Sequence, residues 1–113
     1  MLFRSLRRAQ SVLSPFGWGE ICLRDFETWI AGAALIKPDV SMLETWPDLF
    51  LVGKTYLALP WDLEGMLESL KCYLNDELLM RMVAIHGQDA YRAVWSTTGT
   101  DDFCNHLASI VAP

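Results

Sequence analysis

Short apolar runs alternate along this chain with longer segments in which apolar residues recur at helical spacing. Three runs, at residues 11–14, 33–36 and 56–59, have the length of strands and are bounded by glycine, proline or polar residues. Such runs are typical of a parallel sheet that is buried on both faces. Strands that alternate with helices build an α/β domain. We therefore expect a Rossmann-like half domain with a small, mainly parallel sheet of three to four strands and with flanking and C-terminal helices.

The first long helix of this arrangement is expected to begin near Glu20, directly after the glycine-rich turn at residues 15–19. It is expected to end at Gly32, because glycine readily takes the left-handed conformation at a helix C-terminus. The strand at residues 33–36 follows at once, which completes most of a βαβ unit. The apolar residues at helical spacing, which are expected to be the buried side of this helix, are Leu23, Phe26 and Ile30.

Three charged residues of this segment are candidates for chemistry. Glu20, Arg24 and Glu27 follow one another at intervals of four and three residues, which places them on one face of a helix. Glu20 and Arg24 also have the spacing of a common surface ion pair, which is worth only about 0.3–0.5 kcal/mol. Their joint position at the end of a strand and the start of a helix is stronger evidence for a site than any one of them.

The segment after the second strand supplies further candidates. Lys37 leaves the sheet at the carboxyl end of a strand, where ligands bind in open parallel α/β sheets. Ser41 is expected to cap a short helix that residues 46–48 close, with Glu44 at the capping-box position. Ligand binding is an equally supported role for Glu44. Residues 53–55, Gly-Lys-Thr, are expected to form a turn. They are not expected to form a phosphate-binding loop, because the upstream glycine of such a loop is absent from the sequence.

Three helices are expected in the C-terminal half, where they would cover one face of the sheet. Asp62 is expected to cap the first, and the second spans residues 77–94. A loop at residues 97–100 then leads to the third helix, which Thr100 or Asp101 would cap.

The apolar faces of these three helices give a list of expected core residues. They are Leu63, Met66, Leu67, Leu70, Tyr73 and Leu74 in the first helix, Leu79, Met82, Val83, His86 and Ala90 in the second, and Phe103, Leu107, Ile110 and Val111 in the third. Because His86 falls on an apolar face, a packed core histidine is favoured over a catalytic one. His106 lies beside the last stripe and is expected at the surface.

The stretch PFGWGEICLRDFETWIAGAALIKPD, followed by LETWPD, resembles the donor-binding half of a group-1 glycosyltransferase of the capsular-polysaccharide and spore-coat type, which has the two-domain GT-B architecture. The resemblance covers roughly residues 13–74. In that family a glycine-rich loop precedes a helix with glutamates, and the helix runs into a small-residue-Gly step and a strand. The wider family pattern places seven residues between its two glutamates, whereas six separate Glu20 from Glu27. Glu27, about one turn before the helix end, is therefore the safer match.

The resemblance implies a role for each candidate residue. Backbone N–H groups from Gly17 to Gly19 would receive the diphosphate of a nucleotide-sugar donor. Glu27 would accept the two hydroxyls of the ribose, since an ionised carboxylate has two acceptor oxygens. Glu20 would face the transferred sugar, and Arg24 would orient a glutamate or contact phosphate.

Lys37, Ser41 and Glu44 complete the expected donor-binding set. The resemblance implies no bound metal and no cofactor, and the sequence contains no His/Asp cluster that would hold a metal.

Composition limits the class of protein. The 113 residues, 52% of them hydrophobic, are expected to form one domain over residues 1–113, with a basic leader at residues 1–10. Apart from Arg4, Arg7 and Arg8, 6 basic residues stand against 14 acidic ones, which argues against nucleic acid as a partner. No apolar run approaches the roughly 20 residues of a membrane span.

The three cysteines, Cys22, Cys72 and Cys104, include no C-x-x-C pair, so we expect small core residues in a reducing, cytoplasmic protein.

These observations predict a glycosyltransferase-like fragment that binds a nucleotide-sugar donor. Two-domain glycosyltransferases bind the acceptor with an N-terminal domain, and this sequence contains no counterpart of it. We therefore expect the chain to be incomplete and inactive alone, and to associate with a missing N-terminal domain or with itself. The alternative is a non-catalytic interaction or binding module that retains the fold.

Overall fold

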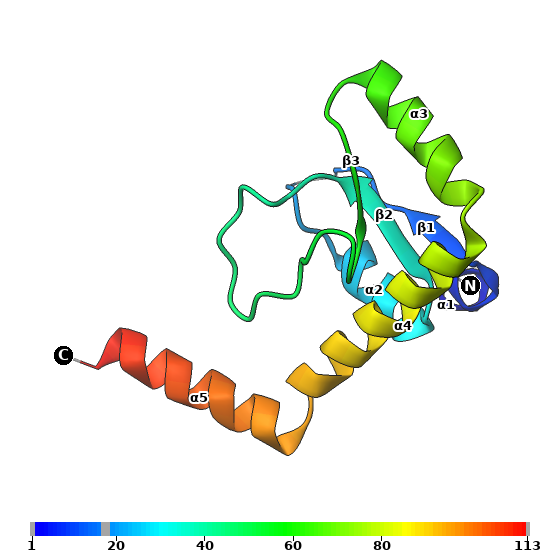
Figure 1. The fold of residues 1–113 in the computed structure, drawn as a ribbon. Coiled ribbons are helices and arrows are strands. Elements are labelled where there is room, and N and C mark those ends of the chain that lie inside the picture. Colours follow the sequence, from blue (N-terminus) through cyan, green and yellow to red (C-terminus); the bar gives the residue numbers. More distant parts are fainter. Residues whose placement is uncertain (1, 17–18, 113) are drawn as a thin grey trace.

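The computed structural model describes residues 2–16 and 19–112, and the side chains of all of these except residues 2 and 3 (Figure 1). The elements in chain order are α1 (Leu2–Arg8), β1 (Ser11–Leu13), α2 (Leu23–Ala31), β2 (Ala34–Pro38), β3 (Leu57–Leu59), α3 (Leu63–Leu74), α4 (Glu77–Val94) and α5 (Thr97–Val111).

The three strands form one parallel sheet in the order β1-β2-β3, which confirms the expected α/β class. Val12 pairs with Leu35, and Ile36 pairs with Leu57, so β2 is the central strand. β2 continues through Lys37 and Pro38, two residues further than the apolar run predicts. All five residues of β2 are buried. The carboxyl ends of the three strands lie at one edge of the sheet.

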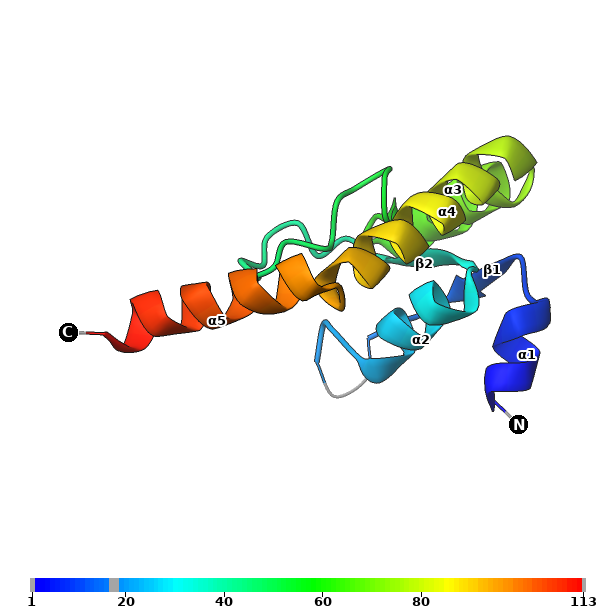
Figure 2. The same cartoon turned by 90° about the horizontal axis from the view of Figure 1, so that it is seen from below.

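Successive residues of the central strand supply opposite faces of the sheet. Ala34 and Ile36 pack in a cluster with Val83 of α4, whereas Leu35 packs in a second cluster with Trp29 of α2. Figure 2 shows the resulting layers, with α3 and α4 on one side of the sheet and α1 and α2 on the other. The helix that follows the glycine-rich turn is therefore pressed against one face of the sheet, beside the carboxyl ends of β1 and β2.

α2 begins later than the sequence pattern predicts. Its first residue is Leu23, and Glu20 precedes the helix. The start is fixed at Cys22, whose backbone N–H donates to the carboxylate of Asp25 at 3.1 Å. The end agrees with the expectation, because Gly32 has the left-handed φ of 77°. The prediction of a helix starting near Glu20 is wrong because a side chain three residues into the helix caps it.

The buried side of α2 also differs from the predicted one. Asp25, Thr28 and Trp29 are the buried residues of the helix, while Leu23 is 73% and Ile30 44% exposed. An indole contributes more apolar area than a leucine or isoleucine side chain. The helix therefore turns its tryptophan inward. Phe26 is half-buried and packs beside Trp29 as predicted, whereas the predicted burial of Leu23 and Ile30 is wrong.

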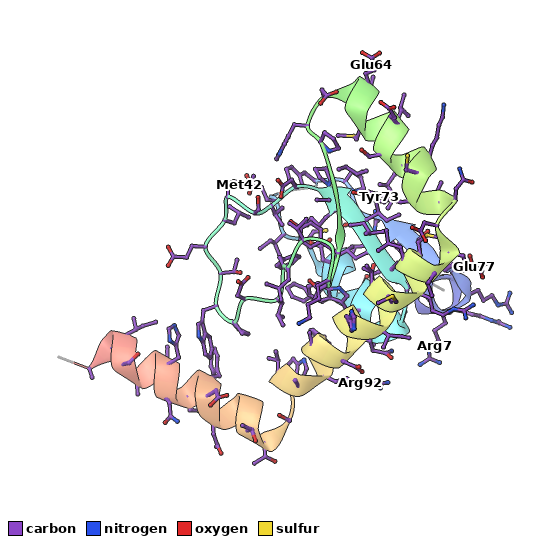
Figure 3. All side chains as sticks on the ribbon, in the orientation of Figure 1. Arg7, Met42, Glu64, Tyr73, Glu77 and Arg92 are labelled. Atoms are coloured by element: carbon purple, nitrogen blue, oxygen red, sulfur yellow. The ribbon has the colours of Figure 1, made fainter. Side chains whose placement is uncertain are left out.

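The connection from β2 to β3 contains no helix, so the predicted cap at Ser41 is wrong. The Ser41 backbone N–H and hydroxyl both donate to the carboxylate of Asp39, at 2.8 and 3.0 Å. A local turn of this kind competes with helix formation for the same backbone groups. The connection swings out from the sheet around Met42, as Figure 3 shows.

α3 and α4 have the predicted bounds, and the Asp62 carboxylate accepts from the Gly65 N–H at 2.6 Å as an N-cap. The predicted burial of α4 is partly wrong, because His86 is exposed and Met82 is 48% exposed. The residues that α4 buries are Met80, Val83, Ala84 and Gly87. In α3 no residue is fully buried, and Leu63, Leu67 and Leu74 are exposed.

α5 departs most from the expectation. It begins at Thr97 with Ser96 as its N-cap, whose hydroxyl accepts from the Gly99 N–H at 3.1 Å, so the predicted loop at residues 97–100 is wrong. The helix points away from the sheet (Figures 1 and 2). Its predicted core residues are therefore exposed, and these are Phe103, Leu107, Ile110 and Val111.

The cysteines are free thiols, of which Cys72 and Cys104 are exposed and Cys22 is half-buried, so their prediction as core residues is wrong. In the part of the chain that the structure describes, the helices are too short or too polar to cross a membrane.

Candidate functional site

A buried ion pair lies at the carboxyl edge of the sheet. Lys37, the fourth residue of β2, and Asp25, the third residue of α2, each have a relative exposure of 0%. The Lys37 ammonium contacts the Asp25 carboxylate and donates a second hydrogen bond to the Glu20 carbonyl at 2.5 Å. The pair therefore connects the central strand to the segment that enters α2.

Asp25 is the centre of a wider network. Its carboxylate accepts from the Ser14 hydroxyl at 2.7 Å and from the Cys22 backbone N–H at 3.1 Å. Ser14 directly follows β1, and its own N–H donates to the Ile36 carbonyl at 2.8 Å. One carboxylate thus joins the ends of two neighbouring strands to the start of the helix.

Aromatic rings enclose the Lys37 ammonium. It lies 5.7 Å from the ring centroid of Phe16 and 5.2 Å from that of Phe50, within the range of cation–π attraction. Phe16 in turn packs edge-on against Trp61, with 4.6 Å between ring centroids. Because Phe16 follows β1 and Trp61 follows β3, this aromatic contact spans the end of the central strand. The lysine is closed off from solvent, and the prediction that Lys37 itself contacts the donor does not fit its position.

The three charged residues expected at the site are separated by the late start of α2. Glu20 lies before the helix and is exposed, Arg24 is exposed on the helix, and Glu27 is half-buried. Within residues 2–16 and 19–112, their side-chain charged groups have no hydrogen-bond or ion-pair partner. At 3.6 residues per turn, Glu27 lies about 200° around the helix from Asp25, so the two carboxylates face different sides.

The other residues predicted for the site also lie in different parts of the molecule. Gly17 lies outside the described residues, and Gly19 is half-buried beside Glu20. Ser41 and Glu44 are exposed in the connection from β2 to β3, and the Ser41 hydroxyl is bound by Asp39. The structure therefore brings Lys37 to the backbone of Glu20, while Ser41 forms a separate turn.

That turn is tied to the sheet by Tyr56. Its hydroxyl donates to the Asp39 carboxylate at 3.2 Å and accepts from the Val40 N–H at 3.3 Å. The hydrogen bonds from the Ser41 backbone and hydroxyl lower the pKa of Asp39. Burial is the main cause that raises the pKa of Tyr56 to about 12, so its phenol remains protonated at neutral pH.

Asp39→Asn tests this turn through pH dependence. A carboxyl whose folded pKa lies below its ordinary value of 3.8 stabilises the fold above that pH, and the contribution is lost as the pH falls through the folded pKa. We expect the variant to be less stable than the wild type at pH 7 and the difference to shrink on acidification below 3.8. Urea unfolding at a series of pH values measures this, and parallel curves for the two proteins would contradict it.

Two surface hollows lie elsewhere on the molecule. One of about 350 Å³ opens beside α1 and the start of α4, and one of about 360 Å³ lies between the β2–β3 connection and α5. In the second region His106 stacks on Trp46 with 4.1 Å between ring centroids, which makes this histidine half-buried where the sequence predicted the surface. Among the described residues, no three His, Cys, Asp or Glu side chains gather in a way that would hold a metal ion.

Sequence reasoning missed Asp25 and Ser14, although a signal for them exists. Lys37 continues an apolar run that reads as a buried strand, and a buried lysine needs an anionic partner. Asp25 shares the helical spacing of Trp29, the largest apolar residue of α2. A search for the carboxylate facing this lysine would have selected Asp25.

Comparison of the chain with family models, with curated proteins and with solved structures finds no match.

Proposed function

We propose that this chain is the donor-binding part of a glycosyltransferase and binds a nucleotide sugar at the carboxyl edge of its parallel sheet. The proposal takes up the resemblance of residues 13–74 to the GT-B donor half. In this proposal the chain transfers a glycosyl group only together with an acceptor-binding part. The ligand would lie against the segment between β1 and α2.

One observation carries the proposal. The protein satisfies the buried polar groups at this edge completely, yet leaves Glu20, Arg24 and Glu27 without partners among the described side chains. In an open parallel α/β sheet this edge is where ligands bind. A nucleotide sugar that met all three side chains would extend from Glu20 at this edge around the start of α2 to the side of the helix away from Asp25, where Glu27 lies. It would offer hydroxyl donors to the two acids and anionic oxygens to Arg24.

The chemistry assigned to each group follows from its charge and position. The start of α2 favours anionic groups, because the N–H groups of its first turn point toward the edge. Glu27 lies in the second turn, about 6 Å along the helix axis from Leu23, and can accept both hydroxyls of a ribose. Arg24, one turn before Glu27, would balance the charge of the diphosphate. Glu20 lies nearest the strand ends and would face the sugar that is transferred.

Glu27→Gln is expected to weaken binding of the nucleotide sugar by about 10- to 100-fold, because a hydrogen bond to a charged acceptor contributes about 1.5–3 kcal/mol. The fold should be unchanged, since the carboxylate has no partner among the described residues. Isothermal titration with a panel of nucleotide sugars measures the first effect and thermal unfolding the second. The chain is tested alone and joined to the acceptor domain that the proposal requires.

Glu68→Gln is the matched control, because Glu68 is exposed in the middle of α3, and α3 lies on the opposite side of the sheet from α2 (Figure 2). It makes the same chemical change and should leave binding as it is. If Glu27→Gln unfolds the chain, Glu27 is structural and its assignment to the ribose fails.

A non-catalytic interaction module is the second candidate, and exposed apolar side chains favour it. Leu78 and Ile85 of α4 are 68% and 53% exposed, and Ile110 of α5 is 66% exposed. Donor binding separates the two functions. The glycosyltransferase proposal requires saturable binding of at least one nucleotide sugar, and an interaction module does not.

A further inference from the structure

We propose that the Asp25–Lys37 ion pair is a clamp that fixes the backbone entering α2, which makes Lys37 a positioning residue for the ligand site. The inference rests on the proposed function for what the edge binds, while the clamp itself rests on contacts within the chain. This positioning role replaces the direct contact between Lys37 and the donor that the sequence analysis expected, because the lysine is fully buried.

The contacts of the pair are directed at backbone groups of one short segment. Lys37 donates to the Glu20 carbonyl at 2.5 Å, and Asp25 accepts from the Cys22 N–H at 3.1 Å. These two groups lie on either side of Ile21. The segment is thus held from both directions by two side chains that also hold each other.

An ion pair at this place is difficult to explain by stability alone. Removing charges from water is costly, and apolar residues of similar volume often replace a buried pair without loss. The surroundings would suit such a replacement, because the rings of Phe16 and Phe50 flank the Lys37 ammonium. Apolar side chains could fill the space, but they could not donate to one backbone group and accept from another. The directed hydrogen bonds are what the charges add.

The position of the clamped segment gives it a function. It leads from the glycine-rich turn into the first turn of α2 and carries Glu20 at the strand ends. A segment already held in its bound conformation does not lose conformational freedom when the ligand arrives, which raises affinity. The clamp therefore preorganises this wall of the site without touching the ligand.

Two variants test the clamp. Lys37→Met removes the ammonium and leaves a buried carboxylate, which will destabilise the chain. The double variant Asp25→Asn/Lys37→Met removes both charges, which restores neutrality while the Glu20 carbonyl still lacks its donor. Arg81→Met is the control, because it breaks the exposed pair between Arg81 and Glu77, whose charged atoms lie 3.4 Å apart.

Amide hydrogen exchange gives the first readout and does not depend on any ligand. In the double variant we expect the amide of Cys22, the one amide of residues 20–22 that is hydrogen-bonded within the described chain, to exchange at least about tenfold faster, whereas the amides of β2 and β3 keep their protection. The control should change neither group. Wild-type exchange at the Cys22 amide in the folded double variant would overturn the clamp, and so would an increase shared equally by the strands.

Titration with nucleotide sugars gives the second readout. We expect the double variant to bind at least about tenfold more weakly than the wild type, with the control unaffected. Equal affinity of wild type and double variant would overturn the positioning role. If the wild type binds none of the nucleotide sugars while the Cys22 amide still exchanges faster in the double variant, the proposed function fails and the clamp stands.

Discussion

Trp29→Ala is expected to cost about 3–5 kcal/mol of unfolding free energy, the range measured when a buried aromatic residue is truncated. Trp29 is 1% exposed and packs against the rings of Phe50 and Tyr91, with centroid distances of 5.0 and 6.2 Å. Its indole N–H donates to the Thr55 carbonyl at 2.9 Å, and that acceptor would lose its partner. A domain of this size has only about 5–15 kcal/mol in total, so the variant should be largely unfolded under mild denaturing conditions.

The close approach of α4 explains why this site cannot relax. A methyl group at Gly87 would lie 2.5 Å from a carbon of the Trp29 ring, so the helix is already in contact with the indole. Urea unfolding followed by circular dichroism measures the loss. Trp95→Ala is the matched control, because Trp95 is 72% exposed and its removal should change stability by less than about 0.5 kcal/mol. A similar small change for both variants would show that the core is not built on Trp29.

The order of strands and helices could be predicted, because each element has its signals in the local sequence. The three apolar runs became the three strands, and the bounds of α3 and α4 agree with their caps and spacing. Gly32 ended α2 as expected, since its conformation depends only on the absence of a side chain. These features need no knowledge of what packs against them.

The errors share a different origin, which is that each depended on a distant partner. α2 was expected to begin at Glu20, but Asp25 and Lys37 fix its start through contacts across 12 residues of chain. Ser41 has the sequence of a helix cap, but it donates to Asp39 instead, beside the hydroxyl of Tyr56, the residue before β3. Periodicity alone also cannot say which of two apolar stripes turns inward.

The exposed apolar stripe of α5 is another error that depended on a packing partner. Phe103, Leu107 and Ile110 have the spacing of a buried face, and the sequence analysis placed them in the core. In the structure the helix extends beyond the sheet, so nothing in the described chain covers them fully. A pattern of apolar residues shows that a face suits burial, and the packing partner has to be found separately.

For the candidate site, the structure overturns only the direct ligand contact expected of Lys37, and the roles of Glu20, Arg24 and Glu27 stay predictions. Glu27 and Arg24 have no partner among the described side chains, while Lys37 is buried against Asp25. A charged residue looks the same in a sequence whether it faces solvent or a buried carboxylate. The distinction requires the fold, because only the fold places Asp25 against Lys37.

The proposed function predicts that this chain alone catalyses no multiple-turnover glycosyl transfer. A transferase lowers its barrier largely by holding donor and acceptor together in the reacting orientation, an effect worth roughly 7–11 kcal/mol. Under the proposed function the three-stranded sheet would form one wall of such a cleft, and Glu20 and Arg24 are exposed to solvent. Without an opposite wall the lower end of that range is lost, which corresponds to a rate about 10⁵-fold slower.

The measurement uses the monomer isolated by size exclusion, labelled nucleotide sugars and a panel of acceptors, with a complete two-domain glycosyltransferase as the positive control. We expect saturable donor binding without product from the chain, and product only when an acceptor-binding part is supplied. Donor binding and transfer are thereby separated, because Glu27→Gln should weaken the first, whereas the second should require the acceptor-binding part. Multiple-turnover product from the purified monomer would contradict the prediction, since it would mean that one wall orients both substrates.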